Sequence, residues 1–161
     1  MSIKNLGSTN LNKKTICGIA TDIYSIMFQD KYDPQAIPSA WKKFWSDFPK
    51  ESLPANSEAY GVSFPIETEP GKLHYVAGVE VAEGFTAPTG FEVCEIPAGN
   101  YLKLQHSGKI MSLSESYGQA YGVEFPKSGL EMRAAPHLEL YDSNLDPMSD
   151  EFKMGILIPT K

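Results

Sequence analysis

The clearest periodic pattern of apolar residues lies between positions 37 and 48. Its large side chains recur at intervals of three or four, and the positions between them are mostly polar, which is typical of an amphipathic helix. Pro38 suits the first turn of such a helix, and Pro49 favours its end. We therefore expect a helix over residues 38–48 with one apolar face. That face carries Ile37, Trp41, Phe44, Trp45 and Phe48.

Other stretches alternate between two sets of side chains, which is typical of β-strands. In residues 72–81, Tyr75 and Ala77 share one face. Gly78 leaves a gap on the other face, as happens where another backbone or a ligand approaches closely. We expect strands at 15–26, 59–66, 72–81, 91–96, 101–106, 130–142 and 153–158, and a second helix at 107–121 that Gly108 and Gly118 weaken.

The order of these elements is strand, helix, strand, strand, and it occurs twice. Such a pattern predicts an α+β fold made of two related lobes. We expect a flexible lead-in at residues 1–14 and a single domain at 15–161, with lobes at about 15–83 and 90–161. Residues 59–65 and 120–126 are identical at six of seven positions. Since the first copy opens an expected strand and the second follows an expected helix, we interpret this identity as chance.

A carboxylate stands beside an aromatic ring near the C-terminus. In the strand expected around residues 136–141, alternation puts His137, Glu139 and Tyr141 on one face and the leucines on the other. If that face borders a cavity, the acid and the ring are suited to an organic cation. If it faces water, the pattern has no functional meaning.

Composition and charge exclude several classes of protein. The chain has 161 residues, 42% of them hydrophobic, and a net charge of −6, with no cluster of Lys and Arg for nucleic-acid phosphates. Its apolar runs are too short to span a bilayer, and no secretory signal is evident, so we expect a cytoplasmic protein. We expect Cys17 and Cys94 to be reduced thiols. His106 and His137 are expected to be ordinary, partially exposed residues, without a metal or other cofactor.

Several short motifs occur in an order that resembles GyrI-like effector-binding domains. These are the ligand-sensing domains of bacterial multidrug-responsive transcription activators, and some exist as stand-alone proteins, including integron-cassette products. The motifs span most of residues 15–159. They are Ile37-x-x-x-Trp41-x-x-Phe44, Tyr60-Gly61-Val62, the run from Tyr75 to Val81, the run from Ile96 to Tyr101 with Gly108 after it, and Leu138-Glu139-x-Tyr141.

The resemblance implies a fold and a ligand site. Two pseudo-symmetric strand-helix-strand-strand units would form a curved antiparallel sheet around a central groove, backed by two helices. Glu139 matches the acidic groove residue that the family carries on a late strand. Family regulators place a helix-turn-helix segment before this domain. Only residues 1–14 precede the first expected strand here, so we do not expect this chain to bind DNA directly.

We expect the groove to bind lipophilic, cationic small molecules. A cation would supply the missing counter-charge, and each cation–aromatic contact would add about 0.5 to 2 kcal/mol. The expected ligand-binding residues are Glu139, Trp41, Tyr75, Tyr101 and Tyr141.

Two other functions remain open at this point. Some GyrI-like proteins resemble hydrolases of strained electrophilic natural products, and Glu139 with Tyr141 or Tyr101 would then act as base and assisting hydroxyl. Alternatively, the chain is a ligand-responsive partner of gyrase or of a DNA-binding protein. A homodimer formed through edge strands is also open.

Overall fold

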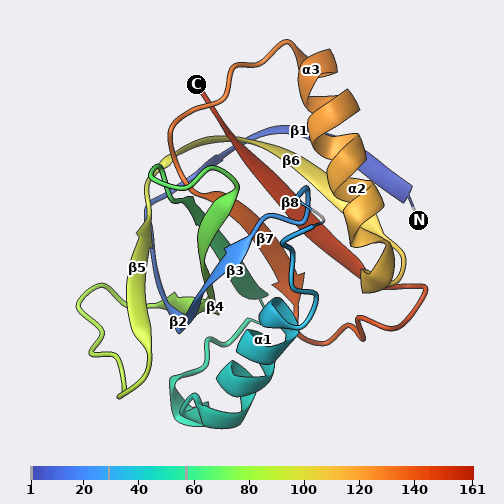
Figure 1. Ribbon diagram of the computed structural model, residues 1–161. Helices are drawn as coiled ribbons and strands as arrows, with labels where there is room; N and C mark the ends of the chain where they lie inside the picture. Colours follow the sequence, from blue (N-terminus) through green and yellow to red (C-terminus); the bar gives the residue numbers. More distant parts are fainter. Residues whose placement is uncertain (1, 29, 57) are drawn as a thin grey trace.

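One antiparallel sheet of eight strands forms the centre of the computed structural model, which describes residues 2–28, 30–56 and 58–161 (Figure 1). Its strand order is β1-β6-β8-β7-β3-β4-β2-β5. The strands are β1 (Ser2–Leu11), β2 (Lys14–Tyr24), β3 (Glu58–Pro65), β4 (Lys72–Val81), β5 (Glu92–Ile96), β6 (Gly99–Ser107), β7 (His137–Asp142) and β8 (Lys153–Thr160). The helices are α1 (Ala36–Asp47), α2 (Leu113–Gln119) and α3 (Phe125–Ser128), with short turns η1 (Lys50–Ser52), η2 (Ile110–Ser112) and the π-helical η3 (Ala120–Glu124).

The sheet contains two units of the expected order. β2-α1-β3-β4 and β6-α2-β7-β8 meet at the β3–β7 pair, and each contributes its strands to the sheet in the same relative positions. This confirms the α+β fold. Each unit is also preceded by a strand that pairs with the other unit: β1 pairs with β6, and β5 pairs with β2. The two units thus exchange their leading strands.

The strand exchange explains the curvature of the sheet. β1 forms one edge of the sheet and β2 lies second from the other edge, yet only residues 12–13 connect them. β5 and β6 stand in the mirrored relation, with residues 97–98 between them. Connections of two residues cannot cross the width of eight strands, which lie about 4.8 Å apart. The sheet must therefore roll up until its two edges come close together.

The flexible lead-in expected at the N-terminus is wrong for residues 2–11. They form β1 and pair with β6 along its whole length, from Ser2 opposite Ser107 to Leu11 opposite Gly99. The polar composition misled the prediction because β1 is an edge strand whose side chains are mostly exposed. Its stability comes from main-chain hydrogen bonds, and the amino-acid pattern does not register these.

The strand expected at 130–142 begins only at His137. The preceding segment, residues 130–136, is a loop that the side chain of Arg133 attaches to neighbouring strands. Its guanidinium donates to the carbonyl oxygens of Thr160 at 3.0 Å and Asn100 at 3.1 Å. Main-chain hydrogen bonds also hold the loop at an isolated β-bridge between Met132 and Thr160.

The second helix begins later than expected, at Leu113, and continues past residue 121. α2 passes through the π-helical turn η3 into α3, which ends at a left-handed glycine, Gly129. Pro126 lacks an N–H group, and its ring would clash with the carbonyl of Gly122 in a regular helix. A π-helical turn at this point widens the helix, which accommodates the proline.

The two faces of the sheet bury different cores. Both helices pack on one face, where α1 covers a cluster that includes Cys17 and Phe44, and α2 covers a cluster that includes Leu104 and Leu113. The opposite face closes on itself. Its cluster consists of Ile16, Tyr60, Val62, Val76, Ile96, Tyr101, Leu138 and Leu157. The part of the sheet between α1 and α2 therefore belongs to the helix-bearing face.

Candidate functional site

A groove runs between α1 and α2 on the helix-bearing face of the sheet. It has two compartments of about 310 Å³ and 880 Å³. We call the smaller one the histidine compartment, because His137 lines it with Tyr117 and Tyr121, and the larger one the tryptophan compartment, because Trp41 and Trp45 line it. Five residues line both compartments: Ile26, Tyr32, Ile37, Leu113 and Glu139. Cavities of this size accommodate small organic molecules.

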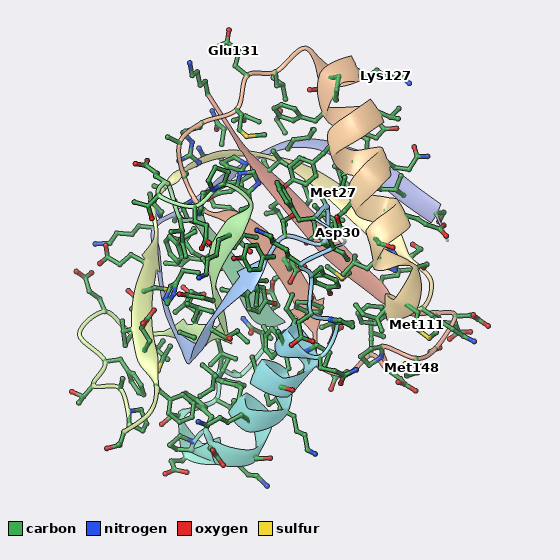
Figure 2. All side chains as sticks on the ribbon, viewed as in Figure 1. Met27, Asp30, Met111, Lys127, Glu131 and Met148 are labelled. Atoms are coloured by element: carbon green, nitrogen blue, oxygen red, sulfur yellow. The ribbon has the colours of Figure 1, made fainter. Side chains whose placement is uncertain are left out.

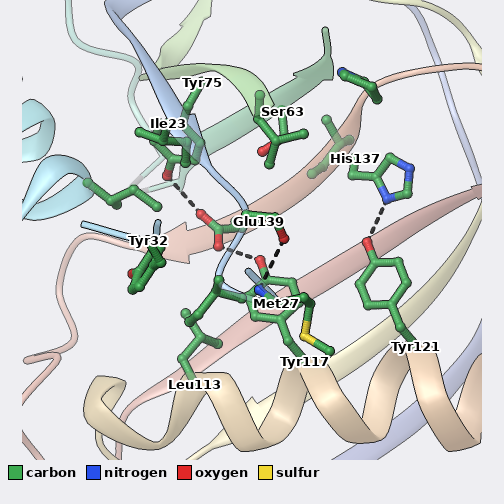
Figure 3. A pocket seen from close by; sticks show the side chains of 16 residues that line it. Ile23, Met27, Tyr32, Ser63, Tyr75, Leu113, Tyr117, Tyr121, His137 and Glu139 are labelled. Atoms are coloured by element: carbon green, nitrogen blue, oxygen red, sulfur yellow. Dashed lines mark hydrogen bonds between the residues drawn. The ribbon is translucent and has the colours of Figure 1, made fainter. Parts of the chain in front are cut away.

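Glu139 lies at the junction of the two compartments, with 5% of its surface exposed (Figure 3). Three tyrosine hydroxyls donate to its carboxylate. Tyr75 and Tyr141 donate to Oε1 at 2.7 and 2.8 Å, and Tyr117 donates to Oε2. Among the residues that the structure describes, no Lys, Arg or His lies within ion-pairing distance of this carboxylate. The hydrogen-bond partners of this carboxylate among the described residues are therefore neutral hydroxyl groups.

The sequence of β3 makes room for this arrangement. Gly61 pairs directly with Glu139 across the β3–β7 ladder. A Cβ at Gly61 would lie 2.3 Å from the Tyr75 hydroxyl and 2.6 Å from Glu139 Oε1, which is far inside contact distance. The glycine of the Tyr60-Gly61-Val62 motif is thus required by the hydrogen bond on the neighbouring strands.

A second layer of aromatic contacts holds the tyrosines in place. The indole N–H of Trp41 donates to the Tyr75 hydroxyl at 3.1 Å, and the ring of Trp41 packs edge-on against Tyr141 with centroids 5.2 Å apart. Burial, and secondarily the charge of Glu139, raise the pKa values of Tyr75, Tyr117 and Tyr141 well above the usual range. All three hydroxyls therefore remain protonated donors at physiological pH.

The structure brings four of the five expected ligand-binding residues together. Glu139, Tyr75, Tyr141 and Trp41 form one connected network. Tyr101 lies on the opposite face of the sheet, where it is fully buried, lines neither compartment and donates to the carbonyl of Pro136 at 3.4 Å. Alternation in β6 explains this, because Leu102 and Leu104 take the helix-bearing face and leave Tyr101 on the other.

Tyr117 and Tyr121 also line the groove, although they were not among the expected ligand-binding residues. They stand four residues apart along the second helix, and this spacing puts both on one helical face. Their rings lie 6.0 Å apart and within 20° of parallel. Tyr32, which follows β2, also lines the groove. Aromatic residues at helical spacing were the available signal for the α2 pair, and Tyr32 had none.

His106 differs from the expectation of an ordinary, partially exposed residue, whereas His137 is partially exposed and lines the groove. His106 is fully buried: Ser116 donates to its Nδ1 at 2.5 Å, and its Nε2–H donates to the carbonyl of Gly108 at 2.9 Å. His137 lines the histidine compartment and shares a 2.5 Å hydrogen bond between its Nδ1 and the Tyr121 hydroxyl. Burial lowers the pKa of His137 to about 4, so its imidazole is neutral at pH 7.

Methionines line the mouth of the groove (Figure 2). Met27 borders the histidine compartment, and Met111 and Met148 border the tryptophan compartment. Their exposed fractions are 53%, 74% and 56%. Methionine is flexible and polarisable, and it adapts to ligands of different shape.

In the described residues, no group of His, Cys, Asp and Glu is placed to hold a metal ion, and no helix is long and apolar enough to cross a membrane.

The fold and the groove define an α+β domain with a cavity of small-molecule size. The model of the GyrI-like small molecule binding domain matches residues 21–161. The chain belongs to this GyrI-like family. It is 31% identical over 126 residues to the transcriptional regulator BrlR of Pseudomonas aeruginosa, a match that covers 76% of this chain. The chain spans about half of that regulator, since the match covers 46% of its length.

Solved structures share the fold at low sequence identity. The protein SAV2435, solved bound to tetraphenylphosphonium, has a TM-score of 0.72 and 17% identity, with 100% of this chain and 94% of that chain covered. An integron cassette protein from the mobile metagenome of Vibrio cholerae has a TM-score of 0.69 and 14% identity, with complete coverage of both chains. EcmrR in a DNA complex has a TM-score of 0.66 and 14% identity over 99% of this chain and 57% of that one.

Proposed function

We propose that the groove binds lipophilic organic cations and that Glu139 supplies their counter-charge. The observation that carries this proposal is a buried carboxylate without a cationic partner among the described residues, at the centre of an aromatic groove. Burying a charge is unfavourable unless it is paired. Three hydroxyl donors reduce this penalty, and a ligand cation would remove much of the rest.

The walls of the groove suit such a ligand. Trp41 and the tyrosines present ring faces and edges to a lipophilic body, and each cation–aromatic contact would add about 0.5 to 2 kcal/mol. The methionines at the mouth favour breadth over strict specificity. The small-molecule-binding description of the family and the tetraphenylphosphonium held by SAV2435 support the same ligand class.

Calorimetric titration with tetraphenylphosphonium tests this proposal. We expect saturable binding to the wild type, and a loss of at least about 30-fold, or about 2 kcal/mol, in Glu139→Gln, because the buried counter-charge is gone. Triphenylphosphine oxide, a neutral compound with similar rings, should bind both proteins equally weakly. Unchanged tetraphenylphosphonium affinity in Glu139→Gln would overturn the proposal.

Glu131→Gln is the matched control for this titration. Glu131 lies in the loop that follows α3, and its side chain is 75% exposed and pairs with Lys161 at 3.2 Å (Figure 2). The substitution removes one negative charge, as Glu139→Gln does, at a position outside the groove. Its affinity for tetraphenylphosphonium should equal that of the wild type within about twofold, since solvent and salt screen distant surface charges.

Hydrolysis of strained electrophiles is a second candidate function. It is favoured by the same carboxylate, which lies within hydrogen-bonding distance of phenol groups that could assist as acids. Against it, both carboxylate oxygens already accept hydrogen bonds, and the raised pKa values of the tyrosines make their hydroxyls weak acids. Incubation with cyclopropane-bearing electrophiles, followed by mass spectrometry, should give no product that depends on Glu139.

A further inference from the structure

Two similar side-chain pairs connect the second helix, α2 with its continuation η3, to β7 across the histidine compartment (Figure 3). In the first pair, Tyr117 donates to Glu139. The second pair lies four residues further along the chain, in η3, and two residues back along β7, where the Tyr121 hydroxyl is 2.5 Å from His137 Nδ1. The two pairs lie about 7 Å apart along the strand. The second pair has the geometry of the first, with a neutral imidazole in place of the carboxylate.

In the second pair, one nitrogen of His137 has no partner within the described ranges and is free to form another hydrogen bond. A neutral imidazole offers one donor and one acceptor, and Tyr121 occupies only Nδ1. Ser63 pairs with His137 across the β3–β7 ladder and lines the same compartment. Among the described residues, neither the Ser63 hydroxyl nor His137 Nε2 has a hydrogen-bond partner, and neither atom is buried out of reach of a small molecule.

We propose that Ser63, Tyr121 and His137 form a neutral hydrogen-bonding subsite for a second functional group of the ligand. This inference rests on the proposed binding of cations at Glu139 and specifies the ligand class further. The ligand would be a single cation with an uncharged hydroxyl or carbonyl group about 7 Å from the charge. That separation is close to the reach of a para-substituted phenyl ring attached to the cationic centre.

The charge at this end of the groove supports an uncharged partner. Burial keeps His137 unprotonated at pH 7, so it neither repels a cation nor pairs with an anion. In the described part of the chain, the compartment is lined by one carboxylate, that of Glu139, and by no Lys or Arg. A second positive charge on the ligand would find no counter-charge here. A neutral polar group would find two free hydrogen-bonding atoms.

Two phosphonium probes test the subsite. They are tetraphenylphosphonium and (4-hydroxyphenyl)triphenylphosphonium, which differ by one hydroxyl group. We expect the wild type to bind the hydroxylated probe at least about fivefold more tightly, which corresponds to one neutral hydrogen bond of about 1 kcal/mol. His137→Phe should lose this preference, measured as the ratio of its affinities for the two probes.

The outcomes separate this inference from the proposed function. The wild type could bind both probes with equal affinity while tetraphenylphosphonium binding still depends on Glu139. That result would overturn only the subsite. A preference that survives in His137→Phe would overturn it as well. Loss of all binding dependence on Glu139 would instead overturn the proposed function.

A second variant guards against a folding defect in His137→Phe. Ser63→Ala removes one hydroxyl from a partly exposed strand position and leaves the imidazole in place. It should reduce the preference for the hydroxylated probe, measured as the ratio of its affinities for the two probes. An unchanged preference in both variants would show that these side chains do not contact the added hydroxyl, which would overturn the subsite.

Discussion

Two nearly identical segments of this chain adopt different structures. Residues 59–65 lie within strand β3, and residues 120–126, with the same residues at six of seven positions, form the π-helical turn η3 and the start of α3. Both segments begin with a buried alanine, Ala59 and Ala120. From there their environments diverge. Val62 is fully buried, and its counterpart Val123 is 48% exposed.

The neighbours of each segment account for the difference. β3 lies between β4 and β7 and forms main-chain ladders with both. The second copy continues a helix that has already formed, and a helix extends more easily than it begins. Tyrosine, glycine and valine have only modest intrinsic preferences, so tertiary context decides. The literal repeat was interpreted as chance, and the two structures are consistent with that interpretation.

The largest change in stability is expected for the glycine of the strand copy, Gly61. Gly61→Ala should destabilise the protein by about 3 kcal/mol, because the added methyl group collides with two atoms of a buried hydrogen bond. It should also weaken tetraphenylphosphonium binding, since the contact of Tyr75 with Glu139 must shift. Urea unfolding monitored by tryptophan fluorescence measures the stability. A stability equal to that of the wild type would show that the strand copy does not need its glycine.

The valines should differ by a smaller amount. Val62→Ala removes two methyl groups from the closed core and should destabilise the protein by about 2 kcal/mol. Val123→Ala should change the stability by less than about 0.5 kcal/mol, as is usual for exposed positions. The same urea titrations compare the two variants. Equal effects would contradict the assignment of one copy to the core and the other to the surface.

The two tyrosines of the repeat have different partners, and the partner of Tyr121 makes the stability of the protein depend on pH. Tyr60 lies in the closed core, and Tyr121 pairs with His137. The folded pKa of His137 is lowered to about 4 from an ordinary value of 6.5, so the unfolded chain binds more protons between these values. Stability from this group is complete above pH 6.5 and is lost as the pH falls towards 4.

His137→Phe should remove this part of the acid sensitivity. On acidification from pH 7 to 4.5, the melting temperature of the wild type should fall further than that of the variant. The corresponding difference in unfolding free energy is on the order of 1 kcal/mol, after allowance for the partial exposure of His137. His74 serves as a contrast, because its hydrogen bond with Glu92, together with that to Asp22, raises its pKa. A constant difference across this pH range would contradict the neutral, buried state of His137.

The smallest effect is expected at the glycine of the helical copy. Gly122 is exposed, and a Cβ built on it meets no atom within 4 Å. Gly122→Ala should stabilise the protein by about 0.5 to 1 kcal/mol, because alanine favours a helical backbone. It is also the matched control for Gly61→Ala, since both change the same residue of the repeat. A destabilisation by Gly122→Ala would show that the π-helical turn requires a glycine.

Sequence patterns predicted the helices and strands better than they predicted which side chains border the groove. Alternation in β7 correctly put Glu139 and Tyr141 on one face. The apolar spacing in α1 correctly predicted that Phe44 is buried, but Trp45 on the same stripe is 40% exposed. Alternation cannot tell which face of a sheet borders a cavity, so Tyr101 was misplaced. β1 was missed because its pairing involves the backbone. The roles of Tyr117 in α2 and Tyr121 in η3 depend on how closely these elements approach β7, which the sequence pattern does not indicate.

The exchanged leading strands limit how the groove can admit a ligand. Pulling the two units apart would break the β3–β7 ladder and would also strip β1 from β6 and β5 from β2. Hinged opening of the halves is therefore a cooperative unfolding event. Passage into the groove has to rely on side-chain rotation at its mouth, where Met27, Met111 and Met148 stand. The uptake rate should therefore respond to the size of these three side chains more than to overall stability.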